Sequence, residues 1–110
     1  MSPATIFNAL GDPTRFAIVE RLLADGEASA GELAAPFALS KPAISRHLRL
    51  LEDAGVITRH ADRQYRRFRV RQEAIEAAGA WFSDALRFWS ASLDRLDAHL
   101  RQRGKDGGNG

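Results

Sequence analysis

The sequence has no cysteine among its 110 residues, which excludes disulfides, thiolate zinc sites and thiol catalysis. It has no apolar run near the roughly 20 residues that a membrane helix needs. The N-terminal segment lacks a basic stretch followed by an apolar run, so we expect no secretory signal. It also lacks a glycine-rich phosphate loop, a metal cluster and a positioned nucleophile with its base. These absences predict a cytoplasmic protein that makes no membrane contact, holds no cofactor or metal and is not an enzyme.

The net charge is small, but basic and acidic residues are strongly segregated along the chain. The formal net charge is +2, and fourteen of the sixteen basic residues are arginine. Residues 40–71 hold nine basic and three acidic side chains, so this block carries +6 and the remainder carries −4. Such segregation indicates a polyanionic partner, and arginine suits phosphate and guanine because its donors form a planar fork. Double-stranded DNA is the leading candidate, and the alternative is a merely solubilising surface.

Apolar periodicity and capping residues predict four helices before residue 55. They cover about 3–10, 13–25, 29–36 and 41–54, with candidate N-caps at Asp12, Ser29 and Ser40. Glu32 follows Ser29 by three residues, which completes a capping-box pattern.

Two further segments follow the four helices. Residues 56–70 switch to β-branched and aromatic residues with a period near two, which predicts a hairpin turning at 61–64. Residues 72–103 carry a wide apolar stripe at helical spacing, with Gly79 as a possible interruption. We therefore expect one domain over 1–103 and a disordered tail over 104–110.

The segment 29–70 has the pattern of a helix-turn-helix followed by a basic hairpin. A short helix and a turn at 37–39 precede a second helix that opens SKPAISRH. Ile44, Leu48 and Leu51 form the buried stripe of that helix, which leaves its other faces for the major groove. Lys41 or Arg46 suits guanine, whereas Ser40 and Arg49 suit phosphates. The predicted DNA-binding residues are Ser40, Lys41, Pro42, Ala43, Ser45, Arg46, His47, Arg49, Arg63, Gln64, Arg66 and Arg67.

Three segments, ALGDPTRFAIVERLL, GELAAPFALSKPAISRHLRLLEDAGVI and YRRFRV, resemble the ArsR-type winged-helix repressors of bacteria. The resemblance covers about residues 4–100. It implies a mainly α fold with a two-stranded β-wing in the order α-α-α-α-β-β-α. It also implies a homodimer on an inverted repeat, with repression relieved by a signal such as a small-molecule inducer. The interface would lie on the first and last helices, at Ile6, Phe7, Leu10, Phe82, Leu86, Trp89, Leu93 and Leu96.

The chain departs from the metal-sensing members of this family. Their Cys-x-Cys pair falls on Ser29 and Gly31 here. Asp97 and His99 match the start of a second metal motif, but no later histidine completes it. The resemblance therefore favours the metal-independent members. Two alternatives stay open: a protein-interaction module that uses the long C-terminal helix, and a constitutive autorepressor without an inducer.

Overall fold

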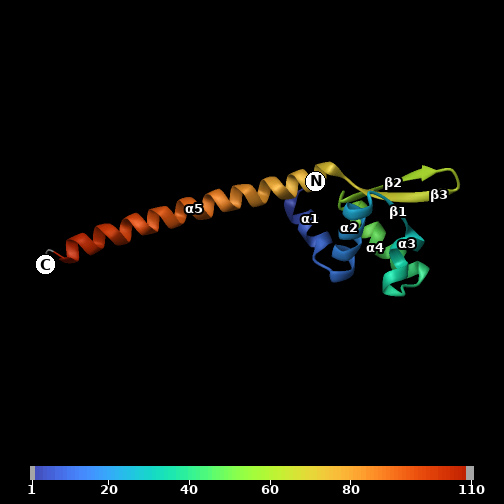
Figure 1. Ribbon diagram of the computed structural model, residues 1–110, viewed down its shortest axis with the longest axis horizontal. Helices are drawn as coiled ribbons and strands as arrows, with labels where there is room; N and C mark the ends of the chain where they lie inside the picture. The colour runs from blue at the N-terminus through green and yellow to red at the C-terminus, as the bar shows by residue number, and fades with distance from the viewer. Residues whose placement is uncertain (1, 109–110) are drawn as a thin grey trace. The chain divides into compact units, whose positions relative to one another are not determined.

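The computed structural model describes residues 2–108, and the side chains of residues 2–104. It contains two compact units, Met1–Ala78 and Gly79–Gly110, which are described separately. The elements, labelled in Figure 1, are α1 (Pro3–Leu10), α2 (Pro13–Asp25), β1 (Ala28–Ser29), α3 (Ala30–Ala34), a 3₁₀ helix η1 (Ala35–Phe37), α4 (Lys41–Asp53), β2 (Ile57–Asp62), β3 (Tyr65–Val70) and α5 (Gln72–Gly108).

Three helices begin at the predicted caps. Asp12 accepts from the backbone of Arg15, and Ser40 accepts from the backbone of Ala43. Ser29 and Glu32 form the complete capping box of α3. These bonds satisfy backbone N–H groups that a helix leaves without partners at its start. The short sequence patterns therefore set where each helix begins.

The hairpin is present, but the sheet has a third strand that the sequence did not predict. The strand order is β1-β3-β2, and both pairings are antiparallel. Ala28 pairs with Phe68, and Ser29 pairs with Arg67. This extra strand pairs only with the two central residues of β3, because it is two residues long.

The core of the first unit lies between its four helices and the base of the hairpin. It is formed by residues that are at most 9% exposed, among them Ile18, Leu22, Leu33, Leu51 and Phe68. Ile6 also lies there and is 0% exposed. That placement corrects its prediction as a dimer-interface residue, because helical spacing turns Ile6 and Ala9 inward together. Phe7 and Leu10 remain partly exposed.

Helix α5 is continuous through Gly79 and reaches Gly108. It therefore passes residue 104, where the sequence predicts that a disordered tail begins, because extending an existing helix adds one hydrogen bond per residue. Residues 109–110 of that predicted tail lie outside the described residues. No helix in the described part of the chain has the length and hydrophobicity needed to cross a bilayer.

The second unit is a single helical segment whose large apolar side chains stay exposed. Phe82, Leu86, Trp89, Leu93, Leu96 and Leu100 are between 46% and 65% exposed. Their spacing alternates between four and three residues, as in the seam of a coiled coil. Trp81 and Phe88 lie beside this row, and they are 47% and 75% exposed. A row of this length on one helix is typical of an interaction surface.

Candidate nucleic-acid interface

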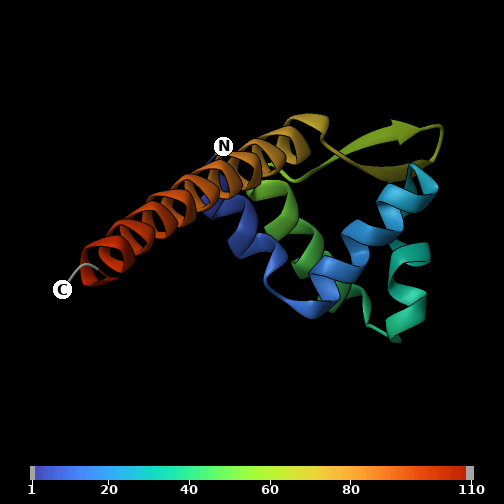
Figure 2. The same cartoon turned by 60° about the vertical axis from the view of Figure 1, so that its left-hand side comes forward.

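The predicted helix-turn-helix is formed by α3, η1 and α4, which lie together in the first unit (Figure 2). Ala38 ends η1 with a φ of 52°, and this left-handed residue reverses the chain before α4. Ile44, Leu48 and Leu51 are at most 3% exposed and attach α4 to the core. The remaining faces of α4 are therefore available to a partner.

Most predicted side chains at the start of α4 are exposed. Ser40, Lys41, Pro42, Ser45, Arg46 and Arg49 are exposed, and Ala43 is partly exposed. His47 differs, because its Nδ1 lies 3.9 Å from a carboxylate oxygen of Asp12 in the cap of α2. Its side chain is only 22% exposed, so it turns toward α2.

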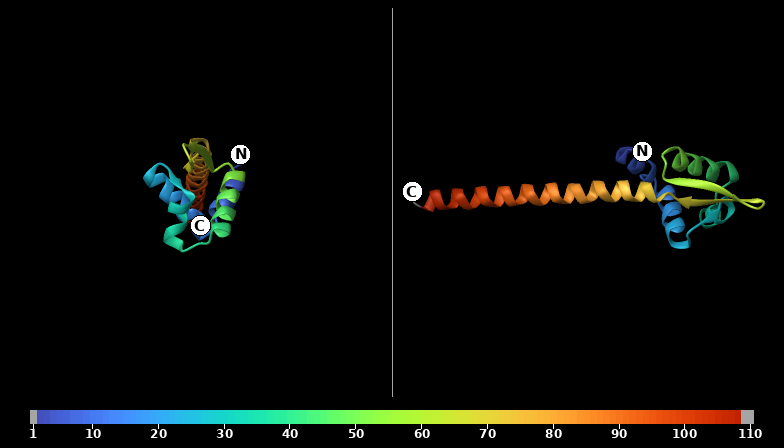
Figure 3. Two further views of the ribbon diagram at one scale, coloured as in Figure 1. Left: turned by 90° about the vertical axis from the view of Figure 1, so that its right-hand side faces the viewer. Right: turned by 90° about the horizontal axis from the view of Figure 1, so that it is seen from above.

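The hairpin β2–β3, called the wing from here on, extends past helices α3 and α4 of the first unit (Figure 3). Its tip is a two-residue turn formed by Arg63 and Gln64, both exposed. Arg63 has a φ of 58°, a backbone conformation that favours glycine. The tip thus places a charged side chain at a position where the backbone conformation favours glycine, which has no side chain.

The two faces of the wing carry different basic side chains with different partners. Strand register places Arg59, Phe68 and Arg66 on the face toward α4. Arg67 lies on the other face, 3.7 Å from each of three carboxylates, those of Glu27, Glu32 and Asp62. His60 also contacts Glu27 there, at 3.2 Å. Alternation around the apolar Phe68 is the sequence signal that separates Arg66 from Arg67.

Six basic side chains of α4 and the wing have no ion pair within residues 2–104. They are Lys41, Arg46, Arg49, Arg63, Arg66 and Arg69. Five of them lie on α4, at the wing tip or on the wing face toward α4. Only Arg69 lies on the other face, which it shares with its strand partner Thr58. Cations left without carboxylates on two neighbouring elements form a surface suited to a row of phosphates.

A cleft of about 240 Å³ separates α4 from the wing. Its charged lining consists of Arg49 and Glu52 from α4 and of Arg59 and Arg66 from the wing. Glu52 accepts two hydrogen bonds from Arg59, each 2.8 Å long. This bonding raises the pKa of Arg59 above its ordinary value. Sequence reasoning missed both residues, because their meeting depends on how the hairpin folds back.

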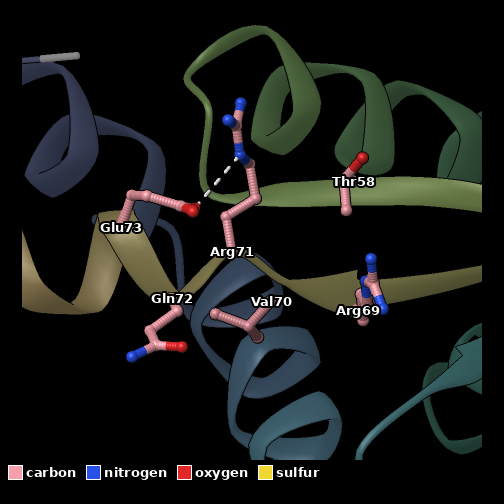
Figure 4. Close-up of a pocket in the computed structure, with 6 residues that line it drawn as sticks. All are labelled: Thr58, Arg69, Val70, Arg71, Gln72 and Glu73. Atoms are coloured by element: carbon pink, nitrogen blue, oxygen red, sulfur yellow. Dashed lines mark ion pairs between the residues drawn. The ribbon is translucent and has the colours of Figure 1, made fainter.

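A second hollow, of about 630 Å³, lies where β3 leads into α5 (Figure 4). Thr58, Arg69, Val70, Arg71, Gln72 and Glu73 line it. Arg71 is paired with Glu73 at 3.6 Å. The hollow is thus built equally from wing residues and from the residues that lead into α5, and it shares no lining residue with the cleft toward α4.

Two of the four positions that match the family's metal motifs make structural bonds. Ser29 caps α3, and its hydroxyl lowers the pKa of the Glu32 carboxyl. Asp97 pairs with Arg101 at 2.9 Å on α5. Within the described residues, no three histidine, aspartate or glutamate side chains come close enough to hold a metal ion.

Comparison with known proteins relates this geometry to a group of regulators. A family model described as a helix-turn-helix domain matches residues 10–60. The HTH-type transcriptional regulator Rv2034 of Mycobacterium tuberculosis is 38% identical, over 96% of this chain and 94% of that protein. The transcriptional repressor SdpR of Bacillus subtilis is 37% identical, over 69% of this chain and 83% of that protein. The crystal structure of an ArsR family transcriptional regulator, RHA00566, has a TM-score of 0.71 at 37% identity and covers 79% of this chain and 89% of that one.

Proposed function

The chain belongs to the ArsR-type family of winged helix-turn-helix, DNA-binding transcriptional regulators, and from this premise we propose that it is a homodimeric repressor of an inverted-repeat operator. Each α4 enters a major groove, and each wing follows the neighbouring backbone. Two α4 helices about 34 Å apart meet successive major grooves of one duplex. The bound dimer blocks polymerase sterically.

The observation that carries this proposal is the distribution of unpaired cations. Lys41, Arg46 and Arg49 stand on the exposed faces of α4 without carboxylate partners in the described residues, and Arg63 and Arg66 stand on the wing. Other arginines of the wing, Arg59 and Arg67, are paired. The charge left over therefore lies on the two elements that a winged helix-turn-helix uses on DNA. Arg46 suits guanine, and Arg49 and Arg66 suit phosphates.

We propose four further features, which concern assembly, regulation and location. The exposed apolar row of α5 supports dimerisation, with Phe82, Leu86, Trp89, Leu93 and Leu96 as interface residues. The missing metal ligands at Ser29 and Gly31 support a metal-independent regulator. An inducer, where one acts, is then a small molecule that favours a dimer geometry mismatched to DNA. A chromosomal DNA target supports a cytoplasmic location.

The test compares Arg46→Ala with the wild type on DNA from upstream of the protein's own gene. We expect Arg46→Ala to lose about 1–3 kcal/mol of binding free energy and to relax the preference at one base position. Arg101→Ala is the matched control, because Arg101 lies on α5 and is already paired with Asp97. Equal losses of binding free energy on specific and random DNA would show that Arg46 contacts only phosphate. A wild-type chain without salt-sensitive binding would refute the proposed function.

A further inference from the structure

One ion pair joins α4 to the wing within the described residues. Glu52 lies in the last turn of α4, and Arg59 lies in β2. The Nε and one terminal nitrogen of Arg59 donate to the two carboxylate oxygens of Glu52, both at 2.8 Å. A bidentate pair of this kind fixes the relative orientation of two planar groups as well as their distance.

Arg59 is held from a second direction by the core. Its guanidinium lies 5.7 Å from the ring centre of Phe68, its strand partner, and Phe68 is 5% exposed. The side chains of Arg59 and Glu52 are 44% and 20% exposed, and pairs so accessible to water add little to global stability. The pair is therefore better suited to setting a geometry than to stabilising the fold.

The pair lies close to the place where β1, the other support of the wing, ends. Strand β1 reaches β3 only at Phe68 and Arg67. Beyond that rung, residues 61–66 form a two-stranded ribbon, and an isolated ribbon of this kind is marginally stable. Two of the unpaired cations, Arg63 and Arg66, lie in this ribbon.

We propose that the Glu52–Arg59 pair is a latch that fixes the wing against α4, so that the cations of both elements meet the operator in a single geometry. The inference rests on the proposed DNA-binding function. Both residues act as positioning residues, through Arg66 and the wing tip. Glu52 is nonetheless an acidic group in a cationic cleft, where it opposes the approach of phosphate.

Because of this opposition, a latch and a purely electrostatic role of Glu52 predict different effects of Glu52→Gln on DNA binding. If Glu52 mattered only through its charge, Glu52→Gln would tighten binding to every duplex. The latch predicts instead that Glu52→Gln loses discrimination between a cognate and a random duplex, because the wing no longer stays in register with α4. Asp53→Asn is the matched control: Asp53 is the next residue of the same helix, exposed and without an ion pair in the described chain.

The probes are a duplex enriched from a random pool by the wild-type chain and a scrambled duplex of the same composition. For Glu52→Gln, we expect the affinity ratio of enriched to scrambled duplex to fall by about threefold to tenfold. For Asp53→Asn, we expect the ratio to stay unchanged. The double variant Glu52→Arg/Arg59→Glu restores the pair with reversed polarity, so it should recover most of the ratio that Glu52→Gln loses.

A readout without DNA accompanies this measurement. Amide hydrogen exchange of residues 61–66 should be faster in Glu52→Gln than in Asp53→Asn, while exchange at Leu51 and Ile57 in the core stays the same. Equal ratios and equal exchange for the two single variants would overturn the latch, as would a charge-reversed double variant with no recovery. A wild-type chain that enriches no duplex at all would instead overturn the proposed function.

Discussion

At the scale of single residues, Arg66 and Arg67 show how far neighbours in one strand can differ. Arg66 is exposed on the wing face toward α4 and has no ion pair in the described chain. Arg67 is half-buried on the opposite face among three carboxylates. A phosphate contact by Arg67 would have to replace those interactions, whereas one by Arg66 replaces only water.

The salt dependence of DNA binding should therefore separate the two arginines. We expect Arg66→Ala to flatten the slope of log affinity against log salt concentration by about one unit, the equivalent of one phosphate contact. We expect Arg67→Ala to change the slope much less. Titrations by fluorescence anisotropy at several salt concentrations measure both slopes. Equal flattening by the two variants would place Arg67 on DNA after all, in agreement with its prediction from the sequence.

Local sequence patterns predicted part of the geometry of the candidate interface and could not predict the rest. The position of Lys41, Arg46 and Arg49 on the exposed faces of α4 follows from helical spacing around a buried stripe. Two of the three carboxylates beside Arg67 do not follow from any local pattern. Glu27 and Glu32 are at least 35 residues away along the chain and come close only through the pairing of β1 with β3.

At the scale of elements, the N-cap residue of α2 makes the stability of the fold depend on pH. The backbone N–H of Arg15 donates to Asp12 at 3.0 Å, and this bond lowers the pKa of the Asp12 carboxyl below its ordinary value of 3.8. A carboxyl with a lowered pKa in the folded state stabilises the fold above its unfolded-state pKa. That contribution is lost as pH falls through the folded-state value.

Asp12→Asn should make the free energy of unfolding less sensitive to acid. Asparagine is a comparable N-cap, so stability near neutral pH should be nearly retained. Between about pH 5 and about pH 3, the wild type should lose more stability than the variant, because asparagine does not titrate. Urea unfolding at each pH measures the difference, and Glu32, present in both chains, cancels from it. Parallel curves of unfolding free energy against pH for the two chains would contradict the assignment of this pH dependence to Asp12.

The wing tip combines an unfavourable backbone conformation with a charged side chain. Arg63 adopts its φ of 58° in a two-residue turn. We expect Arg63→Gly to raise the free energy of unfolding by up to about 1 kcal/mol relative to wild type and to Arg63→Ala. Both variants should bind DNA more weakly, because both lose the charge. Denaturation and binding curves of the three chains test this, and undiminished DNA binding would remove the tip from the interface.

Elements with strong local signals were predictable, and those without them were not. Caps and apolar spacing predicted four helices, and β-branched and aromatic residues with a period near two predicted the hairpin. Strand β1 has only two residues, too few to show a period, and exists because β3 offers a free edge. The predicted end of the last helix lies several residues short of the observed one, because glycine-rich composition is typical of a helix stop, whereas α5 continues to Gly108.

At the scale of the whole molecule, the proposed dimer depends on the apolar row of α5. Trp89 is 64% exposed in the single chain, so an acidic side chain there leaves the first unit intact. We expect Trp89→Glu to give monomers of 12.1 kDa that bind DNA weakly, because a charge in the middle of the seam is not compensated. Light scattering of the purified chain measures the mass.

Ala91→Glu is the control for this experiment. Ala91 is exposed on the same helix but lies off the row that contains Trp89 and Leu93. The control should keep the mass of two chains. A Trp89→Glu chain of that same doubled mass would move the interface away from this part of α5.

Selection of bound duplexes from a random pool by the full-length wild-type chain tests the central claim most directly. If two copies of α4 and the wing bind successive major grooves, the enriched sequences will form an inverted repeat with half-site centres about one helical turn apart. Enrichment of unrelated sequences with no symmetry, or of none at all, would contradict the account.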